Sequence, residues 1–151
     1  MKNFLQKGIT ALELIIVMAI LVILIMAVLP KFSEMKNNQL LKNTEENVLA
    51  TLNTARTQTL ASLNSSGYGV HFQSDKIVLF AGLSYSPSDP SNKVFDMISP
   101  ATISGINLGG SSEIIFEKLS GTPSAYGDIV VSVGSLSKTI TITRAGAIGI
   151  N

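Results

Sequence analysis

The sequence predicts an α+β fold, in which a long N-terminal helix packs on an antiparallel β-sheet domain. Three patterns support this prediction. An apolar run extends from Ile9 to Leu29, apolar residues at helical spacing continue to Leu63, and short alternating segments begin at Tyr68. The expected arrangement is one helix covering one face of a single sheet.

The apolar run is long enough to cross a membrane. Apart from Thr10 and Glu13 every residue in it is apolar, and a helix of this length rises roughly 30 Å, the thickness of a hydrocarbon core. One alternative is a secretory signal peptide, but its apolar core is shorter, about 7–15 residues, and small residues mark its cleavage site. Another is a plain signal anchor, in which Lys2 and Lys7 keep the N-terminus in the cytoplasm.

Glu13 is the single charged residue in the apolar run from Ile9 to Leu29. Placing a carboxylate inside a bilayer costs roughly several kcal/mol, and carboxylates found there usually have a partner. Cleavage of the chain between Gly8 and Ile9 would create an ammonium group on Ile9, one helical turn from Glu13. The new N-terminus, or that of a neighbouring copy, is then a candidate partner.

Residues 7–15, KGITALELI, resemble the prepilin cleavage and methylation motif of type IV pilins and type II secretion pseudopilins. The resemblance implies that a prepilin peptidase cuts between Gly8 and Ile9 and methylates Ile9, and that Glu13 serves filament assembly. The family more often has Phe at the position of Ile9. Pro30 lies where many of these helices kink, and a proline lacks an N–H, so we expect it to interrupt the helix.

The helix is expected to resume as an amphipathic second half. Residues 31–44 read as a polar helical spacer, and the helix is expected to end near residues 64–67, where Gly67 is a plausible stop. The stripe predicted to face the core consists of Leu41, Val48, Leu52, Ala55, Thr59 and Leu63.

The rest of the chain reads as strands and turns. A hairpin is expected from the alternation of Tyr68, Val70 and Phe72, followed by a turn at Ser74-Asp75 and a return strand over 77–80. Residues 83–93 read as a Pro/Ser loop and the stretch between residues 98 and 113 as a Gly-rich connection. Further strands are expected over 94–98, 113–119, 128–133, 138–143 and 147–150, with 134–137 as a hairpin loop.

This layout is similar to the pilin fold. Residues 52–60 with 70–72, and the ending 140–146, are similar to minor pseudopilins and minor type IV pilins. Major pilins often close their C-terminal region with a disulfide, and this chain has no cysteine. The domain prediction is a removed leader (1–8), a transmembrane and polymerisation helix (9–30), a spacer with the amphipathic helix half (31–66) and a β-rich globular domain (67–151).

Candidate chemistry is sparse, so we do not expect an enzyme or a cofactor. His71 is the single histidine, lies on the polar phase of its strand and is expected to be solvated. Asp89 and Asp96 flank a loop that holds Ca²⁺ in some pseudopilins, but they lack the carboxylate spacing of a calcium loop. Asn64 begins a glycosylation sequon of a kind that is common by chance.

Nucleic acid is not an expected partner, because the formal net charge is only +1. Some minor pilins of DNA-uptake machines bind DNA near the last hairpin, where this chain has Lys138 and Arg144. A DNA-binding minor pilin of a competence system is therefore one alternative function. A membrane-anchored domain that never polymerises is another.

The function expected from the resemblance is that of a structural subunit of a type IV pilus or a type II secretion pseudopilus. Its implied partners are the prepilin peptidase, other pilin or pseudopilin subunits, the membrane, and an inner-membrane assembly platform with its motor. Its implied location is the inner membrane, crossed once with the N-terminus in the cytoplasm and the globular domain outside, and then the filament.

Overall fold

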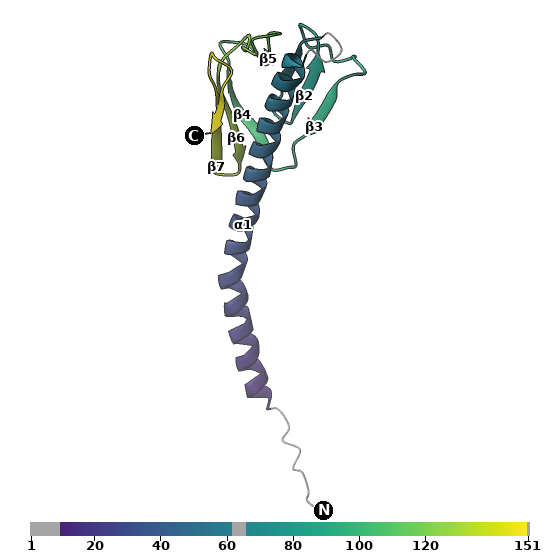
Figure 1. Cartoon of the computed structure of the whole chain (residues 1–151). Helices are drawn as coiled ribbons and strands as arrows, with labels where there is room; N and C mark the ends of the chain where they lie inside the picture. Colours follow the sequence, from purple (N-terminus) through teal and green to yellow (C-terminus); the bar gives the residue numbers. More distant parts are fainter. Residues whose placement is uncertain (1–9, 62–65, 151) are drawn as a thin grey trace, which may run out of the picture. The chain divides into compact units, whose positions relative to one another are not determined.

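The computed structural model describes residues 10–61 and 66–150, and for residues 27–30 it describes only the backbone. It is an α+β structure in which one long helix is followed by antiparallel strands, as the sequence predicts (Figure 1). The elements in chain order are α1 (Ala11–Leu60), β1 (Tyr68–Phe72), β2 (Lys76–Ala81), β3 (Lys93–Asp96), β4 (Ala101–Asn107), β5 (Glu113–Ile115), β6 (Gly127–Val133), β7 (Leu136–Ile142) and β8 (Ile148–Ile150).

Helix α1 continues through Pro30, so the expected interruption of the helix there is wrong. A proline removes one hydrogen bond of the helical ladder, and the turns on either side can carry the helix past it. A kink at Pro30 stays a prediction. The helix ends at Leu60, earlier than expected, and Gly67 lies beyond its end; Leu63 and Asn64 are outside the described residues.

The chain divides into two compact units, with the boundary between Lys36 and Asn37. The second unit contains the C-terminal part of α1 and all the strands. Its strands form two four-stranded antiparallel sheets, not the single sheet expected from the sequence. Their strand orders are β3-β2-β1-β5 and β4-β6-β7-β8.

The second sheet includes a strand that the sequence interpretation missed. Strand β4 occupies part of the stretch expected to be a Gly-rich connection, and it pairs along β6 with a register shift between Ile103 and Gly105. The chain enters the second sheet at β4, returns to the first with β5 beside β1, and then goes back. Strand pairing between segments this far apart leaves no local signal in the sequence.

The two predicted hairpins are present, with one changed turn. Strands β1 and β2 pair from Tyr68 with Ala81 to Phe72 with Ile77, as expected. Strands β6 and β7 pair up to Val133 with Leu136, so their turn has two residues where the sequence interpretation had four. Gly134 begins this turn at a φ of 61°, a conformation that glycine adopts without steric cost.

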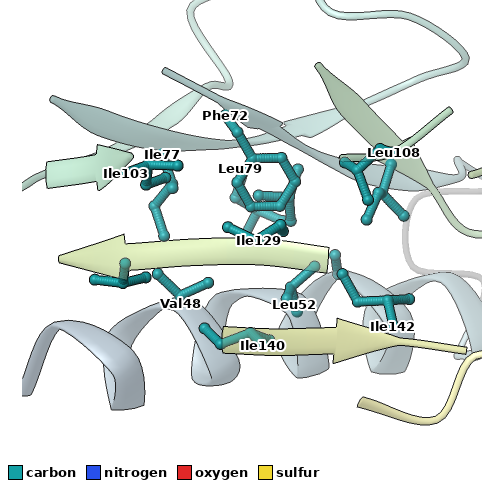
Figure 2. Close-up of a cluster of buried hydrophobic side chains, with 14 of the residues drawn as sticks. Val48, Leu52, Phe72, Ile77, Leu79, Ile103, Leu108, Ile129, Ile140 and Ile142 are labelled. Atoms are coloured by element: carbon teal, nitrogen blue, oxygen red, sulfur yellow. The ribbon is translucent and has the colours of Figure 1, made fainter. Parts of the chain in front are cut away.

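The hydrophobic core lies between the C-terminal part of α1 and both sheets. The helix contributes Leu41, Val48, Leu52 and Ala55, which confirms the predicted stripe as far as Thr59, itself fully buried. Figure 2 shows side chains of this helix and of both sheets pointing toward one another. The labelled members from the strands and loops are Phe72, Ile77, Leu79, Ile103, Leu108, Ile129, Ile140 and Ile142.

Candidate functional site

The predicted processing site lies at the limit of the described residues. Gly8 and Ile9 are outside them, so cleavage and methylation remain predictions from the sequence. Glu13, the predicted assembly residue, lies in the first turn of α1 and is exposed. The first turn of a helix is where a negative charge interacts favourably with the unpaired N–H groups and the helix dipole.

Thr10 caps this first turn. Its hydroxyl oxygen accepts a hydrogen bond from the backbone N–H of Glu13 at 3.2 Å, and its carbonyl accepts one from Leu14 at 3.2 Å. Thr-x-x-Glu directly before an apolar run is the sequence pattern of a capping box, a signal that the sequence interpretation did not use. The start of the helix therefore gives Glu13 a local reason to be there, independent of any partner subunit.

An apolar surface follows directly after Glu13. The large side chains from Leu12 to Met26 are all about half exposed or more, and they cover every side of the helix. A helix that is apolar all round needs a lipid or protein environment, because water solvates such a surface poorly. Among the described residues this is one helix long and apolar enough to cross a membrane, and it lies near the N-terminus.

The two candidate DNA contacts do not form a common site. Lys138 is exposed near the start of β7, whereas Arg144 follows the end of that strand. The guanidinium of Arg144 lies over the ring of Tyr126, 5.7 Å from its centroid, a cation–π contact within the domain. The strand from Lys138 to Ile142 spans roughly 13 Å, and Arg144 lies in the turn beyond it, so the two cations lie toward opposite ends of β7.

His71 is not solvated, which corrects the expectation. Its side chain is 15% exposed, its ring stacks on Tyr85 at 4.1 Å between centroids, and its Nδ1 lies 3.6 Å from a carboxylate oxygen of Glu113. The Tyr85 backbone N–H donates to the same oxygen at 3.3 Å, and the Tyr85 ring also meets Phe80. The loop after β2 thus covers the outer face of the first sheet, which alternation within β1 did not reveal.

The two carboxylates considered for Ca²⁺ lie before β3 and at its last residue. The Asp89 carboxylate accepts hydrogen bonds from the backbone N–H and the hydroxyl of Ser91, which lower the pKa of Asp89, the backbone bond most. Asp96 is exposed opposite Lys76. No group of three His, Cys, Asp or Glu side chains that could hold a metal ion occurs among the residues the structure describes.

Comparisons with protein-family profiles, with curated proteins and with solved structures find no match to this chain. The site therefore has to be interpreted from its own residues: a capped helix start, a carboxylate in the first turn, and an apolar helical surface behind it.

Proposed function

We propose that this chain is a prepilin whose mature form is a structural subunit of a type IV pilus or a type II secretion pseudopilus, with a pilin fold. The observation that carries the proposal is the start of α1. A basic leader ending in Lys7-Gly8 is followed by Glu13 in the first helical turn and by an apolar surface from Leu12 to Met26.

The proposed mechanism is an exchange of apolar surroundings. Cleavage between Gly8 and Ile9 and methylation of Ile9 leave a subunit held in the inner membrane by α1, with its globular unit outside the cytoplasm. An assembly motor and platform then move the subunit into the filament, where its apolar helix contacts the helices of other subunits instead of lipid. The free energy of the apolar surface changes little, because both surroundings exclude water.

Glu13 sets the register in which one subunit lies against the next in the filament. Its carboxylate pairs with the N-terminal ammonium of the adjoining subunit, and the pair is favourable only when both charges leave water together. A subunit placed one turn out of register would bury Glu13 without a partner, which is strongly unfavourable.

Replacing Gly8 tests the cleavage step. We expect Gly8→Ala, or a bulkier change, to block the prepilin peptidase, so that full-length precursor accumulates in membranes. Intact-mass measurement should show the wild type without residues 1–8 and with one added methyl group on Ile9. Normal processing of the Gly8 variant would contradict the cleavage assignment.

Replacing Glu13 tests the assembly step. We expect Glu13→Ala to be cleaved normally but to enter filaments about two to three and a half orders of magnitude less, since an unpaired buried charge costs about 3–5 kcal/mol. Glu34→Ala removes an exposed glutamate from the polar part of the same helix and serves as the matched control. The measurement is the filament yield of the wild type, Glu13→Ala and Glu34→Ala, in sheared surface fractions or in secretion-system pseudopili. Equal yields for Glu13→Ala and wild type would refute the pairing.

A membrane-anchored domain that never polymerises is the second candidate, and the Thr10–Glu13 hydrogen bond favours it. The bond shows that Glu13 lies in the first turn of a capped helix, where a carboxylate interacts favourably with the helix dipole without any partner subunit. An anchor of this kind keeps residues 1–8 and lacks the methyl group, so the same mass measurement separates the two functions.

A further inference from the structure

Helix α1 changes character where its apolar run ends. Residues 31–36 are helical and all exposed, and they close the first compact unit, which ends at Lys36. Most of them are polar, but Phe32 and Met35 are apolar and are 64% and 62% exposed. Single exposed apolar side chains are common on protein surfaces, so the meaning of this pair depends on its neighbours.

The six residues form a two-sided segment of the helix. Each residue turns a helix by about 100°, so Phe32 and Met35 lie about 60° apart on one side of α1. By the same spacing Lys31 and Lys36 lie next to this pair, one on each flank, and Glu34 lies on the other side. We call the side formed by Lys31, Phe32, Met35 and Lys36 the lysine-flanked face.

The two flanking lysines are free to bind a partner. In the part of the chain that the structure describes, the salt bridge of α1 joins Lys42 and Glu46, and neither Lys31 nor Lys36 forms an ion pair with Glu34. A lysine side chain can lie along an apolar surface and still place its charged end on a polar group. The lysine-flanked face therefore offers two ammonium groups beside two apolar side chains.

The position of this face along α1 matches the headgroup layer of a membrane. At 1.5 Å per residue, Phe32 and Lys36 lie about 5 and 10 Å beyond Leu29, the last residue of the apolar run. The headgroup layer is roughly 5–8 Å thick on each side of the hydrocarbon core. Aromatic residues and lysines at this depth are typical of helix surfaces that enter the boundary between headgroups and acyl chains.

The difference between the two sides of the segment indicates that the helix leans. A helix perpendicular to the membrane meets headgroups equally on all its sides. Transmembrane helices lean by about 20° on average, and interfacial aromatic and lysine side chains contribute to the direction. A lean toward Phe32 and Met35 brings both toward lipid and turns Glu34 away from the negatively charged phosphates.

A lipid surface fits the lysine-flanked face better than the N-terminal unit of a second copy does. That unit carries two carboxylates, Glu13 and Glu34, and Glu13 is already assigned to the N-terminal ammonium of a neighbouring subunit. One remaining carboxylate cannot match two lysines. Phosphate groups, by contrast, cover the whole membrane surface and can meet both ammonium groups at once.

We propose that the lysine-flanked face docks onto the outer surface of the inner membrane. Phe32 and Met35 then lie at the boundary between headgroups and acyl chains, and Lys31 and Lys36 bind lipid phosphates. This inference rests on the membrane-held subunit of the proposed function and names the lipid contact that sets the lean of α1 before assembly. Anionic phospholipids strengthen the contact, because they raise the negative potential at the membrane surface.

Tryptophan fluorescence tests the lean, because the native chain has no tryptophan. The full chain is reconstituted in vesicles of phosphatidylethanolamine and phosphatidylglycerol whose acyl chains carry bromine, a fluorescence quencher, near the headgroup. In a helix perpendicular to the membrane, Glu34→Trp is quenched more than Met35→Trp, since position 34 is one residue nearer the membrane centre. We expect the reverse order, because the lean brings position 35 toward lipid.

The two lysines are tested in the Met35→Trp chain. We expect Lys31→Gln together with Lys36→Gln to reduce the quenching and to remove its dependence on the content of phosphatidylglycerol. Lys42→Gln removes an exposed lysine that is paired with Glu46, farther along the helix, and is the matched control that should change neither. Quenching that is the same with and without the two lysines would contradict the phosphate contact.

The outcomes separate this contact from the proposed function. Quenching of Glu34→Trp that equals or exceeds that of Met35→Trp overturns the lean and leaves the filament function standing. A Leu21→Trp chain that lipid bromine does not quench shows that α1 stays outside the bilayer, which overturns both. The expected order in a chain that its own membranes never cleave after Gly8 supports the contact and overturns the prepilin function.

Discussion

Gly69 lies in β1 where the ring of Phe80 crosses the strand. A Cβ atom added there would come within 2.5 Å of the Phe80 ring and 2.7 Å of the Ile114 carbonyl oxygen, both closer than real Cβ contacts. Only a residue without a side chain allows β1 to pass between its neighbours β2 and β5 at this point.

We therefore expect Gly69→Ala to lower the free energy of unfolding by about 1–3 kcal/mol, because the added methyl group overpacks the site. Thermal unfolding of the full chain in detergent measures the effect. Gly149→Ala is the matched control, since Gly149 also lies in a strand but has no atom within 4 Å of the added Cβ. A Gly69 variant as stable as the control would show that the Phe80 ring moves aside freely.

Glu13 illustrates how one residue serves two purposes. Within its own chain it occupies the first turn of a capped helix, where its N–H bonds to Thr10. In the proposed filament its carboxylate pairs with another subunit. The two purposes are compatible, because the first uses the backbone N–H of Glu13 and the second its carboxylate.

Thr59 joins the end of α1 to the first strand. Its hydroxyl donates to the Ala55 carbonyl at 2.8 Å and accepts a hydrogen bond from the Tyr68 backbone N–H at 2.9 Å, with the side chain fully buried. This pair of bonds fixes where β1 begins relative to the helix. Thr59 thus belongs to the buried stripe of α1, and its hydroxyl in addition links the helix to β1.

We expect Thr59→Val to destabilise the fold by about 1–3 kcal/mol, since the Tyr68 N–H would stay buried without an acceptor. Thr54→Val removes a similar hydroxyl bond, to the Ala50 carbonyl, on the exposed side of the same helix. It should change stability by no more than about 0.5 kcal/mol. Denaturant unfolding of both variants gives the comparison, and equal losses would mean that the Tyr68 contact contributes nothing.

The loop between β2 and β3 turns an outer sheet face into a second, smaller buried layer. Val78 and Phe80 are buried although they point away from the main core cluster, and Tyr85 lies against Phe80 and His71. The backbone N–H of Ser91 donates a hydrogen bond to the Asp89 carboxylate, and the side-chain amide of Asn92 donates one to the Ser86 carbonyl. These two bonds hold the loop in one conformation. Both faces of this sheet are thereby protected from water over β1 and β2.

At the scale of the whole molecule, the core belongs to one unit. Every buried apolar residue among those that the structure describes lies between Leu41 and Ile142, inside the unit that begins at Asn37. The apolar helical surface from Leu12 to Met26 contributes nothing to that core. Folding of the globular unit and membrane or filament contact by the N-terminal helix are therefore separable.

We expect a chain of residues 37–151 to fold by itself into a water-soluble domain, with the same thermal midpoint as the globular unit in the full chain. Circular dichroism and an amide proton–nitrogen NMR spectrum measure this. A chain beginning at Leu49 lacks Leu41 and Val48 of the core and should be strongly destabilised. Aggregation of both truncated chains alike would contradict the separation of the two units.

Much of the long-range arrangement had no local signal in the sequence. The pairing of β4 with β6 and the position of β5 beside β1 depend on contacts between distant segments. The partial burial of His71 depends on a loop that folds back over its strand. The continuity of α1 through Pro30 depends on the helical turns around it, which outweigh one lost hydrogen bond.

The amino-acid sequence by itself determined the features that depend on neighbouring residues: the long helix, its core stripe through Val48 and Leu52, the β1–β2 and β6–β7 hairpins, and the apolar segment behind Glu13. These follow from periodicity and turn chemistry, which act over a few residues. Only the tertiary structure decided that the strands form two sheets and that the loop after β2 covers His71. The physical reason is that strand pairing and loop packing join residues far apart in the chain, and their free energy depends on the whole fold.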